Sequence, residues 1–241
     1  METAIGLIVG TSLLYSNLLK TQEIQTINTP YGPADIVTLG GGVIVFRHGK
    51  EGTIPAHRVS HPSNLKALQE RGVKYVIGLQ SVGSLKESIP PGSLLVPDDY
   101  ISLVSVPTIF ESNHDPHIVP SFDETIRTSL LQMLQSEKIP VFEQGIYWQT
   151  VGPRFETRAE IRLLAHFADC VGMTAASEAT VAQEMGLGYC CLCSIDNFAH
   201  GIGSPPLTEE AFHEVVKENT KKMETILNLI LSKKETLICP S

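Results

Sequence analysis

Basic and hydroxyl side chains come directly after several apolar runs of this sequence. Arg47 and His48 follow the run Gly42–Phe46, and Thr11 and Ser81 follow two other runs. A guanidinium beside an imidazole, with hydroxyls nearby, is a compact set of donors for phosphate. Each motif alone also fits an ordinary turn or a surface pair, and the glycines match neither the dinucleotide-binding fingerprint nor the P-loop. The residues favour an anion site if the fold brings them together.

Two further motifs carry an aromatic ring and carboxylates. The run 152–157 reads GPRFET, in which Phe155 can lay its ring on a planar base. Thr157 and Glu160 also have the spacing of a capping box, so this run has a structural interpretation as well. Glu178 lies in an apolar-rich stretch, where a carboxylate needs a specific donor partner.

Length and charge narrow the function classes. The chain has 241 residues, is 42% hydrophobic and carries a formal net charge of −8 from 26 acids and 18 bases. This acidity argues against nucleic acid and anionic membranes as partners, so positive charge for an anionic substrate must be gathered locally. No apolar run reaches the roughly 20 residues of a membrane-spanning helix, and the first residues lack the basic start of a signal peptide.

The cysteines are interpreted as core residues. Cys190, Cys191 and Cys193 crowd into YCCLCSI, an apolar run typical of a buried strand. Neighbouring strand positions face opposite sides and no second cluster completes a ligand set, so we expect no metal site. Reduced thiols indicate the cytoplasm.

Apolar runs bounded by glycine or proline alternate with amphipathic stretches. The predicted strands are Ala4–Val9, Gly42–Phe46, Lys74–Leu79, Ser93–Val96 and Gly188–Ile195. The predicted helices are Pro62–Arg71, Asp123–Gln135, Thr157–Phe167 and Thr208–Leu231, the last with Thr208 as N-cap. The alternation predicts an α/β layered domain with its ligand site beyond the carboxyl ends of the strands. There we expect the turns VGTS, RHG, QSVGS and GMTAASE.

The motifs taken together resemble the trimeric purine nucleoside phosphorylase and methylthioadenosine phosphorylase family. The pieces that carry the resemblance are GTS, RHG, VGSL followed by PPGSLLVPDDYI, GPRFET, GMT…SE and Asn197, and they span Ile5 to Leu231. The resemblance implies one three-layer α/β/α domain, residues 1–241, around a twisted mixed sheet. It implies a homotrimer, or a dimer of trimers, and no metal or organic cofactor.

The same resemblance implies roles for individual residues. The expected phosphate-binding residues are Thr11, Arg47, His48, Ser81 and Thr174. Met173 is expected against the ribose, and the base is expected near Phe155, held by Glu178 and Asn197. His117 resembles a histidine that reaches into the neighbouring subunit's site.

The chemistry that these residues would serve is phosphorolysis of a purine nucleoside. A phosphate oxygen attacks C1′ while charge gathers on the departing purine. Arg47 and His48 can hold the phosphate, and Asn197 can hydrogen-bond N7, so these three are the expected catalytic residues. No protein nucleophile is required, because phosphate itself attacks.

The base is expected to be a 6-oxopurine, as in methylthioinosine, inosine or guanosine. Glu178 suits a purine N1–H, and Asn197 stands where adenine-specific relatives have aspartate. Ala199 matches a second aspartate of those relatives. Asp196 keeps an adenine-specific methylthioadenosine phosphorylase as an alternative, because a shift of one residue would bring a carboxylate to the base.

Three positions depart from the family pattern. Relatives usually have asparagine and tyrosine where Ser60 and His61 stand, and the aromatic residue helps to hold the ribose. Glu209 falls near the 5′ group, where relatives have histidine or valine. The Ser60–His61 pair favours a non-catalytic nucleoside-binding relative as a further alternative. A nucleoside hydrolase is another, with Asp196 as the candidate acid for N7.

Overall fold

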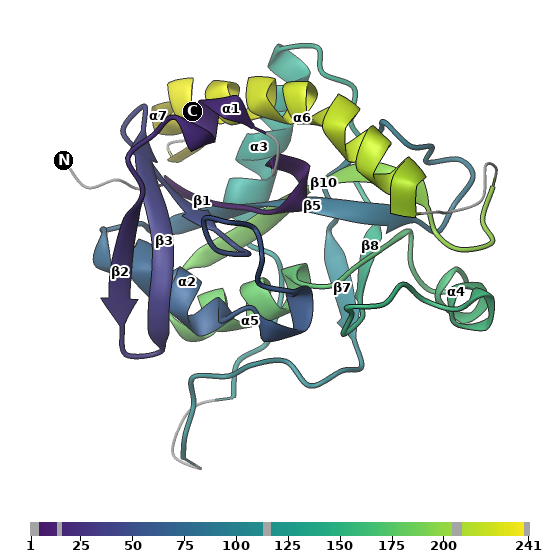
Figure 1. Ribbon diagram of the computed structural model, residues 1–241, viewed down its shortest axis with the longest axis horizontal. Helices are drawn as coiled ribbons and strands as arrows, with labels where there is room; N and C mark the ends of the chain where they lie inside the picture. The colour runs from purple at the N-terminus through teal and green to yellow at the C-terminus, as the bar shows by residue number, and fades with distance from the viewer. Residues whose placement is uncertain (1–4, 14–15, 113–116, 204–208, 239–241) are drawn as a thin grey trace.

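One mixed sheet with helices on both faces forms the body of the protein (Figure 1). The computed structural model describes residues 5–13, 16–112, 117–203 and 209–238. Within them, ten strands make a single sheet. The strands are β1 (Ile5–Val9), β2 (Gln25–Thr29), β3 (Gly32–Leu39), β4 (Gly42–Phe46), β5 (Tyr75–Ser84), β6 (Leu94–Leu95), β7 (Asp99–Ser102), β8 (Ile146–Gln149), β9 (Cys170–Gly172) and β10 (Gly188–Phe198).

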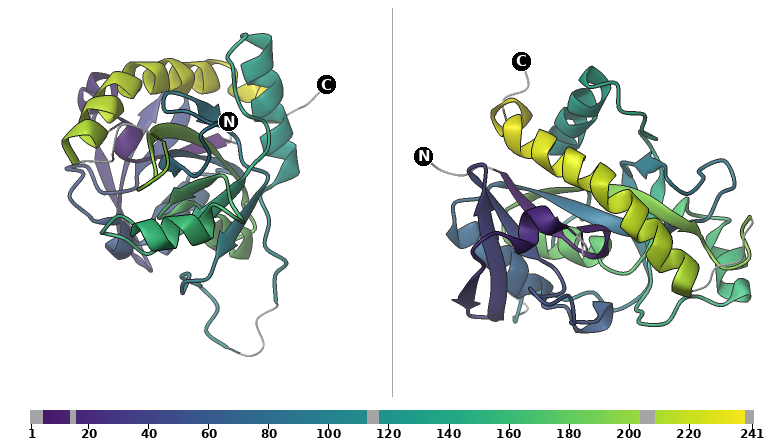
Figure 2. Two further views of the ribbon diagram at one scale, coloured as in Figure 1. Left: turned by 90° about the vertical axis from the view of Figure 1, so that its right-hand side faces the viewer. Right: turned by 45° about the horizontal axis from the view of Figure 1, so that its top comes forward.

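The helices form the two outer layers. The α-helices are α1 (Asn17–Lys20), α2 (His61–Glu70), α3 (Glu124–Ser136), α4 (Arg158–Leu164), α5 (Ala175–Glu184), α6 (Glu209–Ser232) and α7 (Lys234–Ile238), and the 3₁₀ turns are η1 (Thr11–Leu13) and η2 (Ala56–Arg58). Figures 1 and 2 show α3 and α6 over one face and α2 and α5 over the other. The expected three-layer α/β/α fold is confirmed.

The layers follow from strands that are apolar on both faces. Every residue of β1 is buried. Leu7 packs into the core shared with α3 and α6, whereas Ile8 packs into the core shared with α2 and α5. Parallel strands covered on both sides need such continuous apolar runs. A third core, which includes Trp148 and Leu164, holds α4 against the far end of the sheet.

The path of the sheet leaves one stretch of β5 without a strand partner on one edge. β1 runs parallel to β5 and pairs with it as far as Gly78. On the same path β9 joins β5 in the antiparallel sense only at Gly83. Residues 79–82 therefore lie where the order of the sheet switches, which is the usual place for a ligand site in an α/β sheet.

The sequence located the strongest elements and missed the weaker ones. All five predicted strands and all four predicted helices exist, with ends shifted by a few residues. QSVGS is not a turn, because β5 continues to Ser84 alongside β10. GMTAASE opens α5 rather than forming only a turn. Thr208, the predicted cap of α6, lies outside the described residues.

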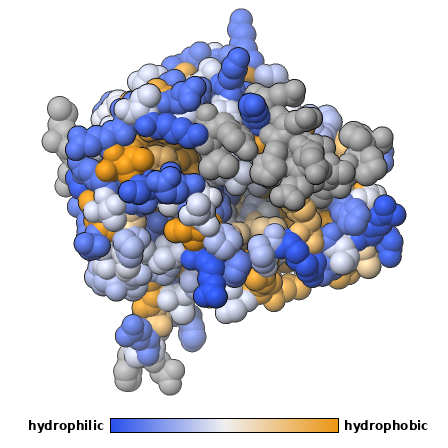
Figure 3. Space-filling model, in the orientation of Figure 1, coloured by the Kyte–Doolittle hydropathy of each residue, from blue (hydrophilic) through white to orange (hydrophobic). Residues whose placement is uncertain are grey.

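The surface is largely polar, and the described cysteines are buried. Hydrophilic residues predominate on the face shown in Figure 3, with hydrophobic residues in separate patches. Among the described helices, none is long and apolar enough to cross a membrane. Cys190, Cys191 and Cys193 are buried in β10 as free thiols, as predicted, and Cys170 is buried and free in β9.

Candidate active site

A cavity of about 130 Å³ lies beside the switch region of β5. Eight of the predicted site residues line it: Thr11, Arg47, His48, Ser81, Phe155, Met173, Thr174 and Asn197. They come from the ends of β1, β4 and β9, from within β5 and β10, and from the loop before α4. Its lining also includes Gln80 and Glu156, which were not predicted.

Arg47 is buried with only 3% of its surface exposed. Its guanidinium donates four hydrogen bonds to the described residues, two to Glu178 and one each to the carbonyls of Leu79 and Ile8. A guanidinium has five N–H groups, so one on Nη1 is left for a ligand. Desolvation opposes its charge, but the Glu178 carboxylate outweighs burial and raises the pKa of Arg47.

Gly10 makes room for this guanidinium. A Cβ at Gly10 would overlap Arg47 Nη1 and lie 3.4 Å from His48 Nε2. Glycine therefore lets the β1–η1 turn approach both side chains closely.

His48 presents a bare nitrogen to this region. Its Nδ1 lies 2.7 Å from the carbonyl oxygen of Ile54, which can only accept, so Nδ1 carries the proton. Burial, followed by the charge of Arg47, lowers the pKa of His48 below its ordinary 6.5. The ring is therefore neutral at pH 7, with the Nε2 lone pair free.

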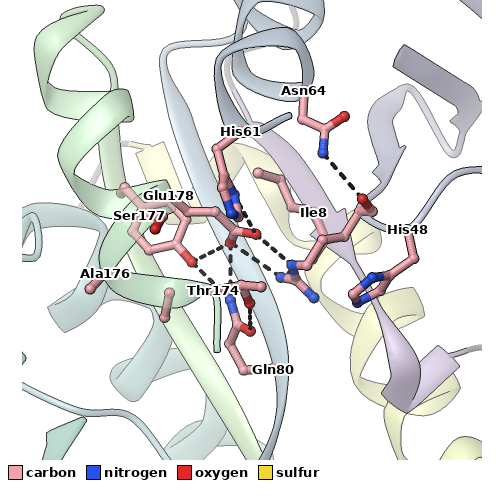
Figure 4. A network of polar contacts seen from close by, with 12 residues as sticks. Ile8, His48, His61, Asn64, Gln80, Thr174, Ala176, Ser177 and Glu178 are labelled. Atoms are coloured by element: carbon pink, nitrogen blue, oxygen red, sulfur yellow. Dashed lines mark hydrogen bonds and ion pairs between the residues drawn. The ribbon is translucent and has the colours of Figure 1, made fainter. Parts of the chain in front are cut away.

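Glu178 does not line the cavity, and the predicted base contact is withdrawn. Its side chain is fully buried on α5 and points at Arg47, with Oε1 2.5 Å from Nε and Oε2 3.1 Å from Nη2 (Figure 4). Gln80 Nε2 at 3.0 Å and the Tyr189 hydroxyl at 2.6 Å also donate to Oε2. Burial opposes its charge, but Arg47 keeps the pKa of Glu178 below 4.5. The expectation that this carboxylate has specific donors is confirmed.

Glu156 is the carboxylate that lines the cavity. It is 8% exposed, and the Thr150 hydroxyl donates to its Oε1 over 2.6 Å. Because Glu156 follows Phe155 directly, the motif GPRFET contained the signal. Thr157 and Glu160 do form the capping box of α4, which accounts for only part of that motif.

Asp196 also lies away from the cavity. The register of β10 against β5 shifts between Ile195 and Asn197, and Asp196 is the unpaired residue of this bulge. A bulge re-aims side chains, and here Asn197 lines the cavity instead. Asp196 is fully buried and accepts hydrogen bonds from Ser81, Ser194 and Asn219. Burial raises its pKa above 3.8.

Two hydroxyls of the cavity are held by other polar groups. Thr174 donates to Gln80 Oε1 over 2.9 Å, and Ser81 donates to Asp196. Gln80 in turn donates to Glu178 and to Tyr189. Gln80 thus links Thr174 to the Arg47–Glu178 pair, a role that its place in an apolar strand did not reveal.

The two other histidines among the predicted site residues, His61 and His117, lie elsewhere. His61 opens α2, is 4% exposed and lines a neighbouring cavity together with Met173. His117 is exposed, in the segment that projects from the body between β7 and α3 (Figure 2). The side chain of Glu209 is outside the described part of the structure. Within the described residues, no group of three His, Cys, Asp or Glu side chains could hold a metal ion.

The chain belongs to the phosphorylase superfamily, whose family model matches residues 4–232. A protein of Archaeoglobus fulgidus named probable 6-oxopurine nucleoside phosphorylase is 44% identical over 234 residues, which cover 95% of this chain and 96% of that protein. A probable S-methyl-5′-thioinosine phosphorylase of Methanocaldococcus jannaschii is 35% identical, with 91% and 88% covered. Methylthioadenosine phosphorylase from Schistosoma mansoni in complex with adenine has the same fold, with a TM-score of 0.83 at 23% identity, covering 98% of this chain and 94% of that one.

Proposed function

We propose that this protein cleaves purine nucleosides with phosphate, releasing the free purine and ribose-1-phosphate or its 5-methylthio form. One observation carries the proposal. A single cavity holds anion donors from Arg47 and Thr11 together with Phe155, Glu156 and Asn197, which suit a purine. The two relatives just described are named as phosphorylases of 6-oxopurine nucleosides and of methylthioinosine.

The reaction needs two contributions from these residues. A phosphate oxygen forms a bond to C1′ while the C1′–N9 bond breaks, and the bonding pair leaves with the purine. Arg47 and His48 hold the phosphate below C1′, and Asn197 hydrogen-bonds N7 to stabilise the charge on the base. Phosphate is the nucleophile and co-substrate, so we propose no metal or organic cofactor.

The preferred base is a 6-oxopurine. A 6-oxopurine carries N1–H, and the carboxylate of Glu156 can accept from it. O6 and N7 are both acceptors, so the Asn197 amide meets them by donating from Nδ2, whose other N–H goes to the carbonyl of Phe198 over 2.8 Å. Adenine has a bare N1, which the Glu156 carboxylate would oppose, so an adenine-specific enzyme is the less favoured alternative.

A second, apolar cavity favours methylthio substrates among the 6-oxopurine nucleosides. Its volume is about 370 Å³, and it shares Thr11, Phe155 and Met173 with the first cavity. Leu13 and Ile54 add apolar lining. A 5′-methylthio group would gain by leaving water for such surroundings, whereas a 5′-hydroxyl would lose hydrogen bonds there.

We propose a homotrimer, or a dimer of trimers, with His117 completing the neighbouring subunit's site. The segment that carries His117 also exposes Leu103 by 80% and Val119 by 85%. Around α4 the chain exposes Leu163 and Phe167. These are apolar surfaces that an interface would bury.

We also propose that each subunit is one domain, built on the single sheet. The protein is proposed to act in the cytoplasm, because its buried cysteines are free thiols, which suit a reducing compartment.

The experiment is a substrate panel with and without phosphate. Inosine, guanosine, adenosine, methylthioinosine and methylthioadenosine are each incubated with the protein, and released base is measured. We expect release from the 6-oxopurine nucleosides only when phosphate is present. Equal release in phosphate-free buffer would identify a hydrolase. Tight nucleoside binding without any release would identify a binding protein.

A further inference from the structure

His200 lies beside the proposed nucleoside site, between two segments that line the first cavity. One segment is the loop 150–157 between β8 and α4, which carries Glu156. The other is the end of β10, where Asn197 and Ala199 contribute to the lining. His200 is half-buried and does not line the cavity itself, so any part that it plays there passes through its neighbours.

The ring of His200 connects these two segments. Its Nδ1 lies 3.2 Å from the carbonyl oxygen of Glu156, and its Nε2 lies 3.2 Å from Nε of Arg158, the first residue of α4. The carbonyl can only accept and the guanidinium can only donate. A neutral ring with its proton on Nδ1 satisfies both contacts, so Nδ1–H donates to Glu156 and the bare Nε2 accepts from Arg158.

The turn that carries His200 is tied to the sheet. The N–H of Ala199 donates to the carbonyl of Ser84 at the end of β5 over 2.8 Å, and the N–H of Ile202 donates back to Ala199 over 2.9 Å. Gly201 has a φ of +92°, and a Cβ there would lie 3.3 Å from Cγ of Arg158. Glycine therefore lets the arginine lie close against this turn.

The spacing between Glu156 and Asn197 matters because a purine presents its polar atoms along one edge. N1–H, O6 and N7 follow one another around a 6-oxopurine, and the proposed partners are Glu156 for N1–H and Asn197 for O6 and N7. The Thr150 hydroxyl orients the carboxylate of Glu156 over 2.6 Å. The His200 contact holds the backbone of Glu156 against the segment that follows Asn197. A shift of about 1 Å between the two partners would weaken both contacts to the base.

We propose that His200 is a positioning residue for base recognition, which sets the spacing between Glu156 and Asn197, and that Arg158 keeps the ring in the tautomer that this role requires. The inference rests on the proposed nucleoside phosphorolysis. It adds a specificity determinant that does not itself touch the substrate.

The first test compares alanine and asparagine at position 200. Alanine removes both contacts of the ring, whereas the side-chain nitrogen of asparagine can take the place of Nδ1 and donate to the Glu156 carbonyl. In His200→Ala we expect kcat/KM for inosine to fall about three- to tenfold, the loss expected for one hydrogen bond. Adenosine should lose less, because it offers Glu156 no N1–H. His200→Asn should recover most of the native ratio of inosine to adenosine.

Two further measurements separate positioning from a general loss of structure. The KM for phosphate and the melting temperature should stay close to the native values in both variants. When Glu156→Gln is already present, adding His200→Ala should lower kcat/KM for inosine little further, because the contact that His200 positions has been removed. An inosine-to-adenosine ratio that His200→Ala leaves unchanged, or that His200→Asn lowers equally, would overturn the proposal.

The second test does not depend on catalysis. Nitrogen-15 NMR of the histidine rings at pH 8 should show His200 with Nδ1 protonated and Nε2 bare. Arg158→Ala should weaken that preference, whereas Arg162→Ala, one turn further along α4, is the matched control and should not. A protonated Nε2 in the native protein would overturn the inference even if the enzyme is active. If no nucleoside is cleaved although the ring has the expected tautomer, the proposed function fails and the role in base recognition fails with it, whereas the hydrogen-bonded link between the two segments stands.

Discussion

Two glutamates near the cavity differ in what surrounds their carboxylates. Both carboxylate oxygens of Glu178 accept hydrogen bonds from protein donors, and Glu178 does not line the cavity. Its negative charge therefore pairs with Arg47 rather than with a ligand. Among the described residues, Thr150 alone donates to the carboxylate of Glu156, which faces the cavity. A carboxylate left with acceptor capacity is the one that can recognise a ligand N–H.

Replacing Glu156 by glutamine should weaken the preference for 6-oxopurines. A carboxylate hydrogen-bonded to N1–H contributes about 1.5–3 kcal/mol, so kcat/KM for inosine should fall about ten- to a hundredfold, with adenosine much less affected. The ratio of the two rates is the measurement. Glu160→Gln, at the capping box of α4, is the control and should leave the ratio unchanged. An unchanged ratio in Glu156→Gln would show that Glu156 does not contact the base.

The bare Nε2 of His48 predicts a pH dependence of phosphate use. Because the pKa of His48 lies below 6.5, its imidazole ring is neutral at pH 7 before phosphate binds. The lone pair of Nε2 would then face a phosphate oxygen. One proton must lie between the two, either on the phosphate or on the ring. As pH rises, this proton is lost to the solvent. We therefore expect kcat/KM for phosphate to fall above neutral pH, by up to about tenfold per pH unit.

Glutamine at position 48 provides the comparison. Its amide N–H can donate to phosphate without taking up a proton, so His48→Gln should have lower activity and a shallower pH profile. Both proteins are assayed from pH 6 to 9 at constant ionic strength. Parallel profiles would mean that the slope belongs to another group.

At the scale of elements, the bulge in β10 decides which of two adjacent side chains reaches the cavity. Asp196 bonds Ser81 of β5, Ser194 of its own strand and Asn219 of α6, so it ties three elements together. Asn197, the next residue, lines the cavity. The bulge thus separates a structural role from a ligand-binding role within two residues.

Asp196→Ala should destabilise the fold rather than change the base preference. It would leave three donors without their acceptor, the buried Ser194 and Asn219 and the partly buried Ser81, which costs about 2–4 kcal/mol of unfolding free energy. Denaturant unfolding measures this loss, and Asp196→Asn, which keeps one oxygen, should lose less. A stable Asp196→Ala protein with a shifted purine preference would restore Asp196 as a base contact.

The sequence predicted those elements whose patterns are strong. β1 and β4 are short buried runs, and α3 begins with its cap at Asp123, so local signals suffice. β2 was missed because all five of its residues are at least partly exposed, and β9 because it has only three residues. Such strands depend on their neighbours in the sheet, which a local pattern does not contain.

Site residues followed the same division. Arg47, His48 and Asn197 reach the cavity as their motifs predicted. The directions of Glu178 and Asp196 depended on a helix orientation and a bulge, neither of which the sequence pattern specifies. The motifs predicted which segments surround the cavity. The packing of the folded chain determined which carboxylate faces the ligand.

At the scale of the whole molecule, the cavity lies at the meeting point of elements that are far apart in sequence. The residues that follow β1 and β4 and the strands β5, β9 and β10 each contribute part of its lining. The projecting segment with His117 lies outside this framework (Figure 2), which is the geometry needed if it serves another subunit. The proposed trimer can therefore be tested through the activity of mixed subunits.

Mixing two impaired variants should restore activity if His117 acts across an interface. Arg47→Ala removes the phosphate donor of a subunit's own cavity, and His117→Ala removes the residue that it lends to its neighbour. Each variant alone has only defective sites. After joint refolding in equal amounts, about one site in four combines an intact cavity from one chain with an intact His117 from the other. Activity should then rise towards about a quarter of the native value, with sedimentation showing trimers or their multiples. If His117 served its own subunit, every site would keep one defect and no activity would return, and a fully active monomer would equally refute the shared site.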